Sequence, residues 1–237
     1  MASRQEEKER RRSERLAREE AERTSAARRK RLQYVVGGLL ALALVGGVVV
    51  LGVLGLGGGG SDSGEPTQPS EAAASVELPT QATGDLQAAA KTAGCKVTHP
   101  EIEGATHETK AFAPADYQTN PPTSGNHTPD WYEDGIYASG GTPDLGKLVH
   151  TLEHGRIDVQ YKPGTPEADV AKLEALLAES EGGYHMLLFE NTTGMDAAVA
   201  ATAWGHSATC ATMSDDVFDV LRTFRAAYID KGPEAVP

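Results

Sequence analysis

Histidine is the residue type whose placement in this sequence could support chemistry. Seven histidines occur, and all of them lie between residues 99 and 206. Two stretches concentrate them, Pro-Pro-Thr-Ser-Gly-Asn-His at 121–127 and His-Thr-Leu-Glu-His at 150–154. The first is a rigid turn that delivers a histidine, and the second places two histidines four residues apart.

These two stretches predict a metal site. In a helix, residues four apart share a face, so the imidazoles of His150 and His154 could converge on one ion. His127, at the end of the Pro-Pro turn, is the predicted third ligand, and His107 is a candidate fourth. Imidazole ligands suit copper and zinc alike, so the sequence predicts a copper or zinc ion without choosing between them.

Two other interpretations of the same histidines stay open. One histidine could pack against the core while its neighbour donates to a backbone carbonyl, in an envelope domain that serves structure or interaction. His-x-x-Glu-His also matches the inverted zinc-peptidase motif, with Glu153 as general base. Such enzymes need a downstream carboxylate ligand in a larger two-domain body, and only about 80 residues follow His154 here. The sequence therefore favours a binding module, in which Glu153 orients a ligand or holds a water molecule, over a hydrolase.

The two cysteines, Cys95 and Cys210, lie on either side of all seven histidines. In an oxidising compartment a disulfide is the expected state of such a pair. Two thiolate metal ligands are the alternative, but the pair lacks the short Cys-x-x-Cys spacing of metal sites.

The elements that must position these residues follow from periodicity and capping. Residues 95–146 are dense in Pro, Gly, Asn and Asp and predict a long ordered loop region, which is where functional residues tend to lie. Beyond it, apolar periodicity alternates between helical and extended. We expect helices over 86–92, 145–154, 166–181 and 215–231, and strands over 157–161, 185–189 and 199–204. The expected fold is α+β, a small antiparallel sheet with helices packed on one face.

The N-terminal third predicts a membrane anchor. Val35–Leu56 is an uncharged apolar run of 22 residues, long enough for a transmembrane helix. Residues 1–34 are charged and polar, which predicts a disordered segment or lone helix, and residues 57–84 read as a Gly/Ser/Pro-rich linker. The alternative is a cleaved secretory or twin-arginine signal, but no clear Ala-x-Ala site follows.

The distribution of charge predicts how the chain is oriented in the membrane and which partners its folded domain can bind. Met1 to Tyr34 carries 12 Lys/Arg against 7 Glu, whereas the whole chain has a net charge of −12. The positive-inside rule therefore predicts a cytoplasmic N-terminus and an extracytoplasmic domain over 85–237. The acidic outer domain argues against nucleic acid as a partner and is compatible with metal cations.

Four stretches of this sequence resemble the domain-of-unknown-function family 3105. They are Pro-Pro-Thr-Ser-Gly-Asn-His at 121–127, Gly-Ile-Tyr at 135–137, Leu-Val-His-Thr-Leu-Glu-His-Gly-Arg at 148–156 and Ala-Trp-Gly at 203–205. The resemblance spans roughly residues 95 to 230 and implies a bacterial protein, commonly membrane-anchored. Its signature histidines fall on the four predicted ligands, whereas His206 lies outside the signature. The resemblance implies a location for a site and no biochemical activity.

Overall fold

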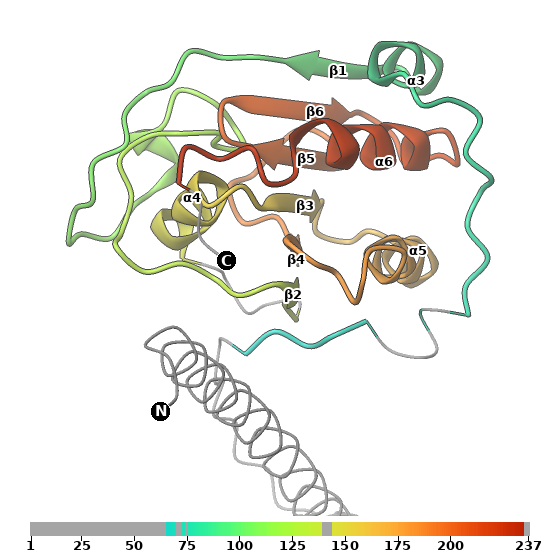
Figure 1. Cartoon of the computed structure of the whole chain (residues 1–237), viewed down its shortest axis with the longest axis horizontal. Helices are drawn as coiled ribbons and strands as arrows, with labels where there is room; N and C mark the ends of the chain where they lie inside the picture. Colours follow the sequence, from blue (N-terminus) through green and yellow to red (C-terminus); the bar gives the residue numbers. More distant parts are fainter. Residues whose placement is uncertain (1–64, 70–72, 74, 139–143, 235–237) are drawn as a thin grey trace, which may run out of the picture. The chain divides into compact units, whose positions relative to one another are not determined.

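The computed structural model describes residues 65–69, 73, 75–138 and 144–234. Within these ranges the chain forms helices and strands in a mixed order (Figure 1). In chain order they are α3 (Leu86–Ala93), β1 (Cys95–Thr98), η1 (Pro114–Asp116), β2 (Gly135–Ile136), α4 (Leu145–Glu153), β3 (Ile157–Tyr161), α5 (Glu167–Ala178), β4 (Met186–Glu190), β5 (Val199–Ala203), β6 (His206–Cys210) and α6 (Val217–Tyr228).

The strands form one six-stranded sheet in the order β1-β6-β5-β3-β4-β2. The half that contains β1, β6, β5 and β3 is antiparallel. The other half is parallel, because β4 runs in the same direction as both β3 and β2. Parallel neighbours require a long crossover, and α5 supplies it between β3 and β4.

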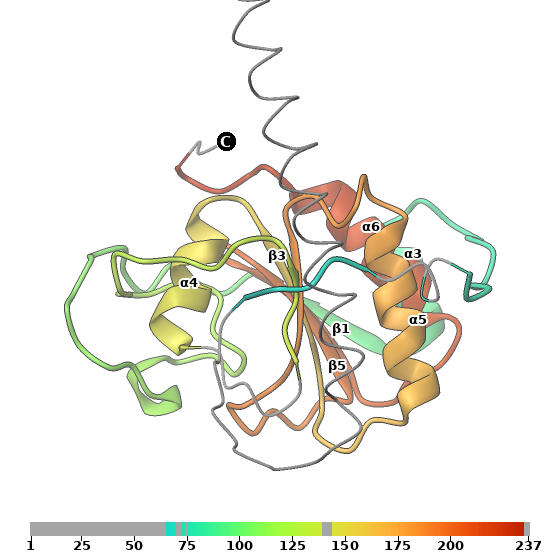
Figure 2. The same ribbon diagram turned by 90° about the horizontal axis from the view of Figure 1, so that it is seen from below.

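Each face of this sheet carries its own core (Figure 2). On one face α3, α5 and α6 cover a large core that includes Ile157, Val159 and Phe224. On the other face α4 and the loop region cover a smaller core that includes Leu187 and Phe189. Successive residues of β3 and β4 therefore point into different cores, as the two-residue period of a strand requires.

The expected α+β class is confirmed, but two details of the expected fold were wrong. The sheet is mixed rather than antiparallel, because the helix at 167–178 carries the chain across to a parallel neighbour. The helices do not share one face, because α4 packs opposite the other three (Figure 2). This second difference matters for function, since α4 carries the histidine pair.

The face beneath α4 buries a carboxyl group of β3. Asp158 is 1% exposed, and its Oδ1 has no hydrogen-bond partner. Burial raises the pKa of Asp158 well above its ordinary value, and the charge of Arg156 offsets this only in part. At a pH above the ordinary pKa of an aspartate, the carboxyl group is ionised in the unfolded chain but protonated in the folded one. This difference destabilises the folded state, and the loss of stability grows as the pH rises.

We expect Asp158→Asn to raise the free energy of unfolding at pH 7 by about 1–3 kcal/mol. The gain should shrink as the pH falls toward 4, because the carboxyl of the unfolded chain then becomes protonated too. Urea denaturation of both proteins at pH 4 and pH 7 measures this difference. Asp196→Asn, at an exposed position, serves as the control. An increase in the free energy of unfolding that is the same at both pH values would contradict the conclusion that folding raises the pKa of Asp158.

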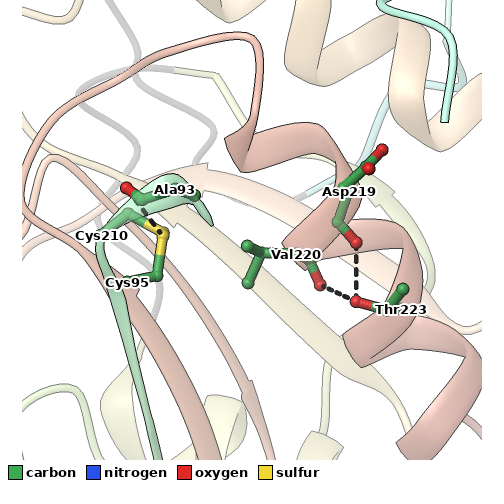
Figure 3. Close-up of a disulfide and its surroundings, with 6 residues drawn as sticks. All are labelled: Ala93, Cys95, Cys210, Asp219, Val220 and Thr223. Carbon is green, nitrogen blue, oxygen red and sulfur yellow. Dashed lines mark hydrogen bonds between the residues drawn. A yellow bond between two sulfur atoms is a disulfide. The ribbon is translucent and has the colours of Figure 1, made fainter. Parts of the chain in front are cut away.

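Cys95 and Cys210 form a disulfide that ties the edge strand β1 to β6 (Figure 3). The two residues are direct cross-strand neighbours, with Cα atoms 4.3 Å apart. Cys210 belongs to the larger core together with Val220 of α6. The predicted disulfide is thus formed in the structure, and both cysteines are used in it.

The predicted linker, residues 57–84, lies partly outside the described residues, and its described part lies against the domain. Thr67 pairs with Ile136 of β2 through two backbone hydrogen bonds of 2.9 and 2.8 Å. Further along, Asp219 accepts hydrogen bonds from the backbone of Ala82 and Thr83. These contacts fix the approach of the chain to α3.

The predicted transmembrane helix, Val35–Leu56, and the charged segment before it lie outside the described residues. Among the residues that the structure does describe, none of the helices combines the length and the apolar character needed to cross a bilayer.

Candidate metal centre

Two loops of the long loop region pair with each other and bring His107 beside His127. Their backbones form an isolated parallel bridge at these two residues. Glu108 N–H donates to the carbonyl of His127 at 2.8 Å, and His127 N–H donates to Thr106 at 3.1 Å. Main-chain hydrogen bonds therefore hold the backbones of both histidines beside each other.

Helix α4 supplies the other side of the site. Asp144 caps its N-terminus, since its carboxylate accepts from Lys147 N–H at 3.0 Å, and the helix ends at Glu153. The His127 loop packs directly on the helix backbone at Gly146. A Cβ added at Gly146 would lie 2.9 Å from the side chain of Thr128 and 3.1 Å from its backbone nitrogen. Only a residue without a side chain allows so close an approach.

Four side chains converge where these segments meet. Ligand atoms of His107, His127, His150 and Glu153 all lie within 4.8 Å of one another. Glu153 Oε2 is 2.9 Å from His127 Nε2 and 3.7 Å from His107 Nε2. Ligands bound to zinc at 2.0–2.1 Å in a tetrahedron lie about 3.3 Å apart, so these spacings are close to those of a metal site.

Backbone carbonyls fix the protonation of two of the imidazoles. His127 Nδ1 lies 2.8 Å from the carbonyl of Gly125, and His150 Nδ1 lies 3.2 Å from that of Asp130. A carbonyl oxygen can only accept, so each Nδ1 carries the proton and each Nε2 presents a lone pair. A histidine that binds a metal is usually held in this way.

The result is a pair of buried acceptors that face each other. His127 Nε2 and Glu153 Oε2 are buried and 2.9 Å apart, but their geometry does not satisfy a hydrogen bond, and neither atom has another partner. Buried polar atoms are nearly always hydrogen-bonded, and leaving one unsatisfied costs about 1–3 kcal/mol. A cation between the two atoms would satisfy both.

Burial also keeps the imidazoles neutral. It lowers the pKa of His127 and of His150 below the usual value, and in His150 the neighbouring His127 adds to the effect. It raises the pKa of Glu153, and the nearby carboxylate of Glu234 adds to that rise. At neutral pH the histidines therefore keep the lone pairs that a metal ion needs.

A family comparison covers most of this part of the chain. The family described as "Protein of unknown function (DUF3105)" matches residues 108–236, more than half of the chain. The chain belongs to this family. No curated protein and no solved structure matches the sequence. The DUF3105 match includes His127, α4 and Glu234, and His107 lies one residue before it.

The DUF3105 domain arranges the predicted ligands differently from the expected set. His154, which was expected to share an ion with His150 and His127, follows the end of α4 and lies in an adjoining group with His150 and Glu234. Glu153, which was expected to orient a ligand or hold a water molecule, lies beside the loop histidines at a distance that suits a ligand. Glu234 was missed, because nothing in the local sequence marks a single glutamate 80 residues after the histidine pair.

Histidines outside the two groups have other partners. His206 lies with its Nδ1 2.6 Å from that of His99, and its ring stacks on Tyr228. His185 Nδ1 lies 2.5 Å from Asp230 Oδ1, within hydrogen-bond distance. These three histidines do not belong to either candidate group of the described residues.

Both tryptophans of the chain lie at the histidine cluster. The ring of Trp204 is 5.9 Å from that of His127, edge to face. The ring of Trp131 is 5.6 Å from His150 and 4.8 Å from His154, and its side chain is partly exposed. Indole fluorescence in the DUF3105 domain therefore reports on the cluster from two sides.

Proposed function

We propose that this protein is a metal-binding module of the cell envelope that holds a copper or zinc ion. Its ligands are His107, His127, His150 and Glu153. The observation that carries the proposal is the buried pair of facing acceptors, His127 Nε2 and Glu153 Oε2, inside a group of four ligand atoms. The structure also supplies the carbonyl contacts that orient metal-binding histidines.

The envelope location rests on two further features. The sequence predicts a membrane anchor at residues 35–56 with the domain outside. The disulfide between Cys95 and Cys210 supports an oxidising compartment, since such bonds are rare in the cytosol. The anchor would keep the bound metal at the membrane surface.

Binding is favoured over hydrolysis because of where Glu153 lies. A general base must stand off the metal and activate a water molecule in an open coordination position. Glu153 Oε2 lies among the ligand atoms instead, 2.9 Å from one imidazole and 3.7 Å from another. Three imidazoles and one carboxylate already satisfy a four-coordinate ion.

Metal analysis of the full chain tests the proposal. The protein is purified without a histidine tag or chelator, loaded with copper or zinc, desalted and measured by mass spectrometry. We expect about one ion per chain in the wild-type protein and none in His150→Ala, because four-ligand sites hold a single ion and His150 belongs to both candidate groups.

His99→Ala is the matched control, since His99 is a described histidine outside both groups. It should bind as much metal as the wild-type protein. Folded wild-type protein that retains neither copper nor zinc would overturn the proposal. The histidine motifs would then be architectural, as in an interaction domain of the envelope.

A further inference from the structure

A second group of potential ligands adjoins the first. Ligand atoms of His150, His154 and Glu234 lie within 4.8 Å of one another. Glu234 Oε2 is 3.5 Å from His154 Nε2, and the other ring nitrogen of His154 is buried without a hydrogen-bond partner. His154 itself is only 4% exposed, so this residue of the second group is a buried imidazole with one unsatisfied nitrogen.

Backbone contacts of the C-terminal segment position this group. Glu234 N–H donates to the carbonyl of Glu153 at 3.1 Å, and Asp230 N–H donates to that of Gly155 at 2.9 Å. Gly232 lies so close to the backbone of Glu153 that any side chain there would clash with it. These contacts hold Glu234 against the end of α4.

The two groups share one residue, His150. His150 Nδ1 is engaged with the carbonyl of Asp130, so only its Nε2 can bind a metal. The rings of His150 and His154 are 4.4 Å apart, and those of His150 and His127 are 4.8 Å apart. His150 can thus serve an ion in either group, but not ions in both groups at once.

The groups also differ in charge and exposure. The four-ligand group contains the fully buried His127 and Glu153, whose side chain is 5% exposed. The second group presents Glu234, whose side chain is 46% exposed, as a carboxylate open to solvent. An exposed carboxylate attracts a hydrated cation, whereas the four-ligand group, in which only His107 is exposed, offers more ligands and stronger retention.

We propose that His150, His154 and Glu234 form an outer uptake position, from which a copper or zinc ion passes through His150 to the inner four-ligand position. This inference rests on the proposed function and adds a route by which the metal arrives. The ion stays bound to His150 throughout. Its other ligands change from His154 and Glu234 to His107, His127 and Glu153. The ion therefore never loses all of its protein ligands.

The rate of metal loading tests this route. The full chain is mixed rapidly with Cu²⁺, which binds imidazole sites more tightly than other divalent first-row metals. Quenching of Trp131 and Trp204 follows the loading. We expect Glu234→Gln to load about tenfold more slowly than the wild-type protein, since it loses the charge that attracts the cation.

Two further variants show whether slower loading comes from the position of Glu234 or from the loss of any negative charge. Glu167→Gln removes one exposed negative charge at the start of α5, on the opposite face of the sheet, and should load at the wild-type rate. Gly232→Ala keeps every ligand but displaces the segment that carries Glu234, so it should load slowly as well.

The possible failures are distinguishable. If Glu234→Gln and Gly232→Ala load as fast as the wild-type protein, the ion enters directly past His107, and the outer position is overturned. If the wild-type protein binds two Cu²⁺ ions at saturation, the two groups act together and the shared-ligand route is overturned. If the wild-type protein binds no metal at all, the proposed function itself fails.

Discussion

His127→Ala is expected to lower the affinity for copper or zinc by roughly a hundredfold or more. Four-ligand zinc sites contribute about 10–16 kcal/mol, so one ligand accounts for roughly 3 kcal/mol, and each 1.4 kcal/mol is a factor of ten. His127 is fully buried and one of its nitrogens is already committed to Gly125, so no nearby group can replace it. Competition against a chelator of known affinity measures the loss.

His206→Ala provides the control, because His206 lies in neither candidate group. It should bind metal as the wild-type protein does. Circular dichroism and tryptophan fluorescence show whether each variant is folded. A folded His127→Ala protein with unchanged affinity would contradict the inner site and would place the retained ion with His154 and Glu234.

Removal of the disulfide, by Cys95→Ala together with Cys210→Ala, is expected to lower the free energy of unfolding by about 2–5 kcal/mol. The disulfide closes a loop across a sequence separation of 115 residues, and it fastens an edge strand that has one neighbour in the sheet. Alanine avoids placing a hydroxyl at the buried position of Cys210. Urea denaturation of the full chain, followed by tryptophan fluorescence, measures the change.

Reduction provides an independent check of the same quantity. A reductant should destabilise the wild-type protein by a similar amount and leave the double variant unchanged. Identical unfolding midpoints for oxidised and reduced wild-type protein would contradict a stabilising role for this bond.

Much of the secondary structure could be predicted from local sequence. The apolar alternation at Ile157–Tyr161 gave the bounds of β3, and the helices at 86–93 and 145–153 were predicted within one residue. These signals are local, because a cap or a periodic stripe acts within a few turns of chain. β1, β2 and β6 were missed. β1 and β2 have only four and two residues, and β6 (His206–Cys210) is mostly polar and small residues without a clear apolar alternation.

The parts that could not be predicted depend on long-range packing. Alternation at β3 indicated a half-buried strand, yet all five of its residues are buried because α4 covers the second face. The helix was expected to continue to residue 154 and to place His154 in one ligand set with His150 and His127. The helix instead ends at Glu153, and that carboxylate faces the loop histidines. Glu234 reaches the site only because the tail lies along the end of α4.

The bridge between Thr67 and Ile136 bears on whether the protein associates with other chains at high concentration. Open sheet edges invite strands of other chains to pair with them, which leads to aggregation. Thr67 occupies the β2 edge of this sheet with two backbone hydrogen bonds. The opposite edge is the four-residue β1, which displays the exposed Lys96. The segment that leads into the domain thus also shields it from self-association, and cleavage after Thr67 would uncover an adhesive edge.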